Sequence, residues 1–103
     1  MEVQLEQFLN RLLTLQKTQR LLLIDQLTAK ECRFIREVSY NILFNSSMQL
    51  TENVRRYFRN NIEHLRLLAS IRICAADKRT LLRSKHLLLK RMAAEALHYL
   101  AKR

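Results

Sequence analysis

The chain has 103 residues, of which 49% are hydrophobic and 27% are charged, and its formal net charge is +10. It contains no glycine, proline or tryptophan. Glycine-rich phosphate loops, dinucleotide-binding fingerprints and nucleophile elbows all need glycine at fixed positions, so the composition excludes them. A chain without these helix breakers favours an all-α fold, with about four helices in a small helical bundle. At this length we expect a single helical domain over residues 1–103.

The first predicted helix spans about residues 2–25 and carries a heptad-like apolar seam. Steps of three and four residues alternate along this seam, which consists of Leu5, Phe8, Leu12, Leu15, Gln19 and Leu22. Such spacing with one polar position is typical of a coiled coil and predicts a long N-terminal helix used for oligomerisation, an association helix over residues 1–26. The same stripe is equally typical of a helix that faces the core of its own monomer.

Two further helices are marked by polar capping residues. Thr28 and Glu31 have the spacing of a capping box, which predicts the start of a second helix. This helix ends near Asn45, which we expect in the left-handed conformation that glycine usually adopts at a helix end. A third helix begins after Thr51, a typical N-cap residue, and ends or bends within residues 70–76.

The last predicted helix begins at Asp77 or Thr80 and runs to the C-terminus. Together with the two helices before it, this segment forms the expected helical core, residues 27–103. Lys85 falls within the apolar stripe of the last helix. It is therefore either a lysine whose stem packs on apolar side chains while its amine reaches water, or a positioned phosphate contact.

The positive charge is confined to the second half of the sequence. Residues 1–52 contain six Lys or Arg and six Asp or Glu, whereas residues 53–103 contain thirteen basic and three acidic residues. The full net charge of +10 therefore lies in residues 53–103. Asymmetry of this kind between two halves of a chain indicates a polyanionic partner.

The candidate nucleic-acid-binding residues follow from this charge distribution. Arginine predominates among them, and its planar guanidinium suits phosphate geometry better than the amine of lysine does. The candidates are Arg55, Arg56, Arg59, Arg66, Arg72, Lys78, Arg79, Arg83, Lys85, Lys90 and Arg91. We expect phosphate contacts with weak sequence specificity, because no helix-turn-helix pattern with a polar recognition helix is evident. Tyr57 lies among these arginines and is either a stacking platform for an exposed base or an aromatic at the core boundary.

No residue constellation typical of catalysis or metal binding is evident in the sequence. The cysteines Cys32 and Cys74 and the histidines His64, His86 and His98 lack the spacing of zinc ligands, so we expect neither metal nor cofactor. The longest aliphatic runs are far shorter than the roughly 18 residues of a transmembrane helix. The N-terminus has no signal-peptide pattern. We therefore expect a non-enzymatic, intracellular protein.

Several short motifs occur in a recognisable order. The sequence EVSYNIL at residues 37–43 precedes Leu50 and Thr51, an arginine-bearing helix, LRLLA at residues 65–69, and a basic-to-leucine run over residues 80–89. In this order, residues 27–89 resemble the short basic proteins of Polinton/Maverick-type and adintovirus-like DNA elements. Some of those proteins are similar to the adenovirus core proteins that condense DNA.

The resemblance implies a role as a virion accessory protein, located in the nucleus or virion. It extends to individual residues only for the basic positions between Arg55 and Lys85. The family pattern has more lysine and continues into a glycine-rich hydrophobic tail, whereas residues 94–103 of this chain contain no glycine. No function of such a tail is therefore expected here.

Two functions of different classes fit the sequence. The first is non-enzymatic nucleic-acid binding through phosphates, most consistent with DNA, with a role in packaging DNA inside a virion. The alternative is a helical protein-protein interaction or oligomerisation module that recognises an acidic partner.

Overall fold

The computed structural model describes residues 2–102, which form seven helices and no strand. The helices are α1 (Glu2–Thr14), α2 (Lys17–Asp25), α3 (Ala29–Phe44), α4 (Glu52–Asn60), α5 (Ile62–Ala69), α6 (Ala75–Ser84) and α7 (His86–Ala101). The all-α prediction is confirmed. The prediction of about four helices is wrong, because the first, third and last expected helices are each divided into two.

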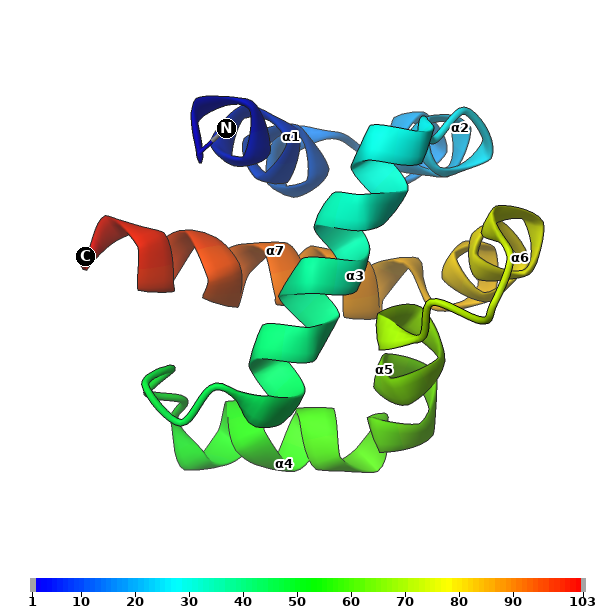
Figure 1. Ribbon diagram of the computed structural model, residues 1–103. Coiled ribbons are helices and arrows are strands. Elements are labelled where there is room, and N and C mark those ends of the chain that lie inside the picture. Colours follow the sequence, from blue (N-terminus) through cyan, green and yellow to red (C-terminus); the bar gives the residue numbers. More distant parts are fainter. Residues whose placement is uncertain (1, 103) are drawn as a thin grey trace.

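Helix α7 lies at the centre of the fold. It packs against α1, α2, α3 and α6, while α3 crosses it and packs mainly on α5 (Figure 1). Buried residues of α7 follow one another at steps of one and three, namely Leu88, Leu89, Met92, Ala93 and Ala96. This broad apolar stripe lets α7 contact neighbours on more than one side.

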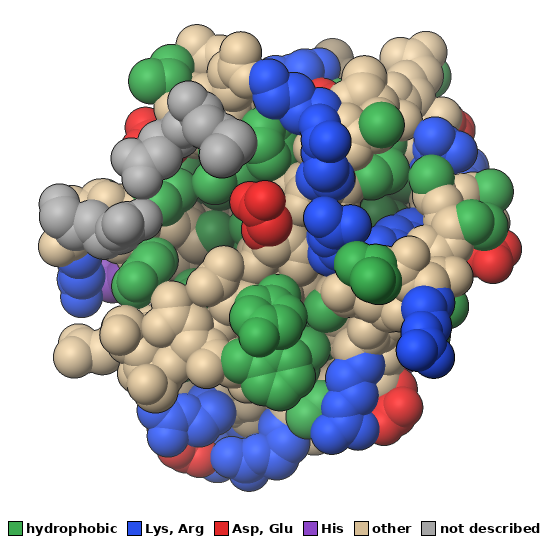
Figure 2. All heavy atoms as spheres, in the orientation of Figure 1, with side chains coloured by type: hydrophobic (Ala, Val, Ile, Leu, Met, Phe, Trp, Pro, Cys, Tyr) green, Lys and Arg blue, Asp and Glu red, His purple; other side chains and the backbone are tan. Residues whose placement is uncertain are grey.

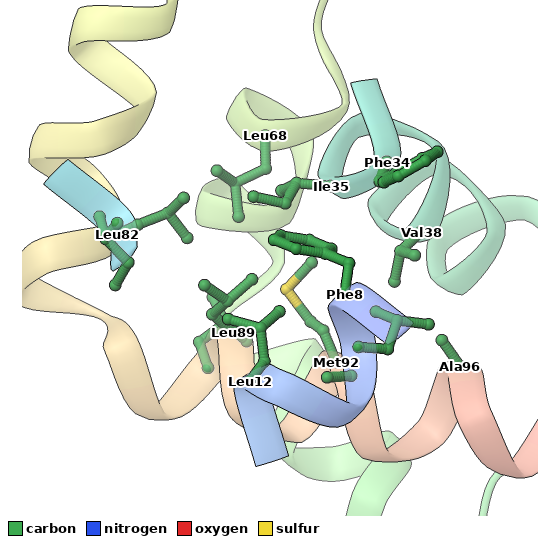
Figure 3. Packing of buried hydrophobic residues seen from close by; sticks show 14 of the residues in the cluster. Phe8, Leu12, Phe34, Ile35, Val38, Leu68, Leu82, Leu89, Met92 and Ala96 are labelled. Atoms are coloured by element: carbon green, nitrogen blue, oxygen red, sulfur yellow. The ribbon is translucent and has the colours of Figure 1, made fainter. Parts of the chain in front are cut away.

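One hydrophobic cluster joins all seven helices. Figure 3 shows Phe8 and Leu12 of α1 directed toward Leu89 and Met92 of α7. The rings of Phe8 and Phe34 pack with their centroids 6.0 Å apart, which ties α1 to α3 as well. The N-terminal segment is therefore part of the same core as the rest of the chain.

The continuous association helix expected over residues 1–26 is not formed. Gln16 has extended backbone angles (φ −70°, ψ 164°) and separates α1 from α2, and its N–H donates to the Gln19 side chain. The carbonyl of Leu15 accepts a hydrogen bond from Arg20 Nη1 at 3.2 Å in place of a helical N–H. Side-chain and cap contacts thus end one helix and begin the next at this point.

The predicted seam is divided along with the helix. Phe8 and Leu12 are buried in the monomer core, Leu5 and Leu15 are half-buried, and Gln19 and Leu22 are exposed. A seam for a partner helix would need all six positions along one face of one continuous helix. The alternative interpretation, a stripe facing the monomer core, fits the α1 part of the pattern.

The other two divisions occur at single residues. Asn61 separates α4 from α5 with φ −115° and ψ 21°, and its Nδ2 donates to the carbonyl of Tyr57 at 2.9 Å. Lys85 separates α6 from α7 with φ −121° and ψ 38°. Lysine is compatible with a helix interior and does not mark a helix end in the sequence, whereas asparagine is common at helix ends, so Asn61 was a signal for this break.

The predicted caps are confirmed at two helices. Thr28 Oγ1 accepts from the N–H of Glu31, whose carboxylate accepts from the N–H of Thr28, and Thr51 Oγ1 accepts from the N–H of Val54. Asn45 ends α3, but its φ of −90° is not left-handed. No residue of the described range 2–102 has a positive φ, as expected where glycine is lacking. The break predicted around residues 70–76 is confirmed, because α5 ends at Ala69, and α6 begins at Ala75 rather than at Asp77 or Thr80.

Candidate nucleic-acid interface

Helix α4 presents three arginines on its solvent-facing side. Val54 and Phe58, four residues apart, are buried in the core, which directs Arg55, Arg56 and Arg59 outward. Lys and Arg side chains accordingly gather along the edge of the molecule that α4 forms (Figure 2). Burial of Val54 and Phe58 in the core thus fixes the orientation of the helix that carries these arginines.

Two further cations reach this surface from α7. The Arg91 guanidinium carbon lies 5.2 Å from the ring centroid of Tyr57, a cation–π geometry that links α7 to α4. Lys90 and Arg91 also line a shallow groove whose other walls include Leu13, Tyr57 and Leu87. We call Arg55, Arg56, Arg59, Lys90 and Arg91 the α4–α7 basic face.

The α4–α7 basic face is free of acidic partners within residues 2–102, because none of its five cations forms a salt bridge there. Arg55 makes one long hydrogen bond, from Nη2 to the carbonyl of Leu50 at 3.4 Å. The guanidiniums and the amine therefore keep most of their donors available to solvent or a ligand.

Tyr57 is half-buried and packs against the hydrophobic cluster. Of the two roles expected from the sequence, the boundary aromatic fits this position. Arg91 covers its ring, so Tyr57 here positions a cation.

Three of the other candidate residues are engaged within the protein. Lys78 is only 6% exposed, and burial, followed by the nearby charge of Arg36, lowers the pKa of its amine. Arg79 donates from Nη2 to the carbonyl of Leu27 at 3.1 Å. Arg83 forms an ion pair with Asp25 of α2. These side chains hold α6 against its neighbours and are poorly placed to contact a ligand.

The remaining candidates are scattered. Arg66 on α5 pairs with Glu63 at 3.2 Å, an exposed interaction that a phosphate could replace at low cost. Arg72 is exposed in the segment between α5 and α6. Lys85 is half-buried at the junction of α6 and α7. Five of the eleven candidates therefore lie on α4 and α7 without an acidic partner in the described range, with Arg55 and Arg59 lining one groove beside α4 and Lys90 and Arg91 lining another.

No protein-family model, curated protein or solved structure matches this chain. A function must be inferred from the surface residues.

The described residues form neither a metal site nor a membrane-spanning helix. Among residues 2–102, no three His, Cys, Asp or Glu side chains are close enough to hold a metal ion. None of the helices in that range has both the length and the apolar character needed to cross a membrane.

A buried arginine and an exposed aromatic pair are two features that the sequence analysis did not predict. Arg20 is buried, and its Nη2 lies 3.3 Å from Nδ1 of His86, a contact across 66 residues that no local pattern indicates. Tyr40 and Phe44 are exposed although both are aromatic. Their four-residue spacing, outside the buried stripe of α3, was the signal that could have revealed them.

Proposed function

We propose that the protein binds nucleic acid through phosphate contacts made by the α4–α7 basic face. The observation that supports this most directly is that α4 and α7, which the contact of Tyr57 with Arg91 joins, carry five cations without acidic partners in the described range. The planar guanidinium of arginine can donate two parallel hydrogen bonds to a phosphate group. Because its donors are already held in a plane, little conformational entropy is lost for each hydrogen bond formed.

Weak sequence specificity belongs to this proposal. Phosphate contacts position a protein on nucleic acid but carry no sequence information directly. Three of the six exposed residues of α4 are arginines, and the two asparagines that could read adenine, Asn53 and Asn60, lie near opposite ends of the helix. DNA packaging in a virion is the biological role that the family resemblance adds to this proposal.

The proposal predicts strongly salt-dependent binding. Titration of the full chain against a short labelled DNA duplex, by fluorescence anisotropy at several salt concentrations, should show affinity that falls steeply with salt. If all five cations contact phosphates, the slope of log K against log salt should be about −4 to −5. A parallel titration with single-stranded DNA should give a shallower slope, since each phosphate contact there contributes about 0.7.

Absence of binding at the lowest salt concentration would contradict the proposal. Binding whose affinity does not change with salt would also contradict it, because counterion release is unavoidable when cations neutralise phosphates.

A further inference from the structure

An exposed aromatic pair lies on α3, away from the α4–α7 basic face. Tyr40 and Phe44 are 57% and 65% exposed, and their ring centroids are 4.8 Å apart with an interplanar angle of 53°. In Figure 2 an apolar patch lies over the C-terminal part of α3, with Lys and Arg side chains near it. Two large aromatics in contact with each other and with water are unusual on a free surface.

A groove runs beside this pair, between α3 and the segment that joins α5 to α6. Tyr40 and Asn41 line it on the α3 side, and Ala69, Ser70 and Ile71 line it on the other. Ile71 is 79% exposed, the highest value among the exposed large hydrophobic residues. Tyr40 and Ile71 thus give the groove two apolar anchor points, and Phe44 extends the apolar surface beyond it through its ring contact with Tyr40.

The rim of the groove is positively charged. Arg36 and Arg72 line it, with Glu37 as the one acidic lining residue, and neither arginine forms a salt bridge within residues 2–102. Arg36 also lies close enough to Lys78 for its charge to help lower the pKa of that amine. An acidic group at the rim would relieve this local repulsion between cations.

We propose that this groove docks an acidic amphipathic peptide of a partner protein. Apolar side chains of the peptide pack on Tyr40, Phe44 and Ile71, and flanking Asp or Glu residues pair with Arg36 and Arg72. Aromatic and arginine side chains grouped around a concavity are the composition that dominates protein interface energetics. Docking of an amphipathic helix by anchors one turn apart is a common mode of peptide recognition.

Charge and shape favour this occupant over two others. A second copy of the chain would bring a second Arg36, Arg72 and Glu37 into the contact, so that four arginines would face only two carboxylates and the interface would keep an excess of positive charge. A single-stranded nucleic acid would find no ring to stack on at Ile71, and the two aromatic rings already face each other in part. No residue of the α4–α7 basic face lines the α3 groove, so this proposal can be tested apart from the nucleic-acid proposal.

A peptide selection tests the docking site. The full chain is immobilised and used to select from a displayed library of random short peptides, and an enriched peptide is then synthesised for calorimetry. We expect enriched sequences with apolar residues three or four apart and with Asp or Glu beside them. Tyr40→Ser and Ile71→Ser should each weaken binding about tenfold or more, because both remove an anchor from the groove.

Charge reversal supplies a second readout. The double variant Arg36→Glu and Arg72→Glu should abolish binding of the acidic peptide and favour basic peptides when the selection is repeated. Leu22→Ser removes an equally exposed apolar side chain from α2 and is the matched control, so peptide affinity should stay within about twofold. Circular dichroism of each variant is the control that checks whether its helical content equals that of the wild type.

Four results would overturn the proposal. One is a selection that enriches no acidic amphipathic peptides, and another is peptide binding that is insensitive to both Tyr40→Ser and Ile71→Ser. The third is loss of single-stranded DNA binding in Tyr40→Ser, which would assign the groove to nucleic acid. The fourth is a dimer in sedimentation experiments that Tyr40→Ser dissociates, which would assign the groove to a second copy.

Discussion

Arg20 is a cation held inside the fold by neutral acceptors. It is only 4% exposed, and it donates to the carbonyl of Leu15 and reaches Nδ1 of His86. Because a guanidinium can only donate, the Nδ1 atom of His86 must act as the acceptor, which requires a neutral imidazole. Partial burial, followed by the charges of Arg20 and Lys17, lowers the pKa of His86.

This contact predicts a loss of stability in mild acid. The pKa of His86 in the folded protein lies below the value of about 6.5 expected for the unfolded chain. As the pH falls through that value, the unfolded state takes up the proton first, so the free energy of unfolding decreases until the folded-state pKa is passed. Above about pH 7.5 both states are neutral at this residue and its contribution is constant.

Urea unfolding at about pH 7.5 and pH 5.5 measures this effect. His86→Asn keeps an acceptor near the position of Nδ1 but cannot titrate, so it should show a smaller decrease in stability between the two pH values than the wild type does. His98→Asn, on an exposed part of the same helix, is the control for loss of an imidazole. Equal pH dependence in His86→Asn and the wild type would exclude His86 as the titrating group.

Lys78 and Arg56 show why charge alone does not identify a binding residue. Both are counted in the basic half of the sequence, but Lys78 is buried and Arg56 is exposed. Lys78 lies one turn before Leu82, a residue with no exposed surface, and so it shares the inward side of α6. This four-residue spacing is visible in the sequence and places Lys78 on the inward side of the helix, but a count of charges does not take it into account.

At the scale of the helices, the sequence predicts starts better than interruptions. Thr28 and Thr51 form the predicted caps because a hydroxyl at that position satisfies an N–H that the helix leaves free. The interruptions at Gln16 and Lys85 occur at residues that favour a helix interior, whereas Asn61 is a residue type often found at helix ends.

The division of the predicted seam leads to a prediction about α1. Leu12 has no exposed surface and packs in the core beside α7, so Leu12→Ala should lower the free energy of unfolding by about 2 to 5 kcal/mol. Leu22 belonged to the same predicted seam but is 57% exposed on α2. Leu22→Ala should therefore change the stability by about 0.5 kcal/mol or less.

Urea denaturation of both variants, at more than one protein concentration, measures this contrast. Equal losses in the two variants, or a midpoint that rises with protein concentration in the wild type but not in Leu12→Ala, would contradict the intramolecular role of the seam.

At the scale of the whole molecule, the all-α class could be predicted from the absence of glycine and proline and from the apolar periodicity. The charge asymmetry between the two halves is a property of the sequence and is equally secure. Which of the basic residues remain free on the surface could not be predicted in the same way. It depends on contacts between segments distant in the sequence, such as those of Arg79 with Leu27 and of Arg83 with Asp25.

The most direct test compares two variants that each lose three positive charges. One replaces three cations of the α4–α7 basic face by glutamine, and the other replaces three exposed cations of the N-terminal half. The substitutions are Arg55→Gln, Arg56→Gln and Arg59→Gln in the first, and Lys17→Gln, Lys30→Gln and Arg33→Gln in the second.

The salt dependence of DNA-duplex affinity is the quantity to measure in both variants. The α4 variant should lose about 0.9 of slope for each phosphate contact removed, about 2 to 3 in all, and bind more weakly at every salt concentration. The N-terminal variant should keep a slope close to that of the wild type. Equal losses of slope in the two variants would show that binding follows net charge rather than the α4–α7 basic face, and would contradict the proposed interface.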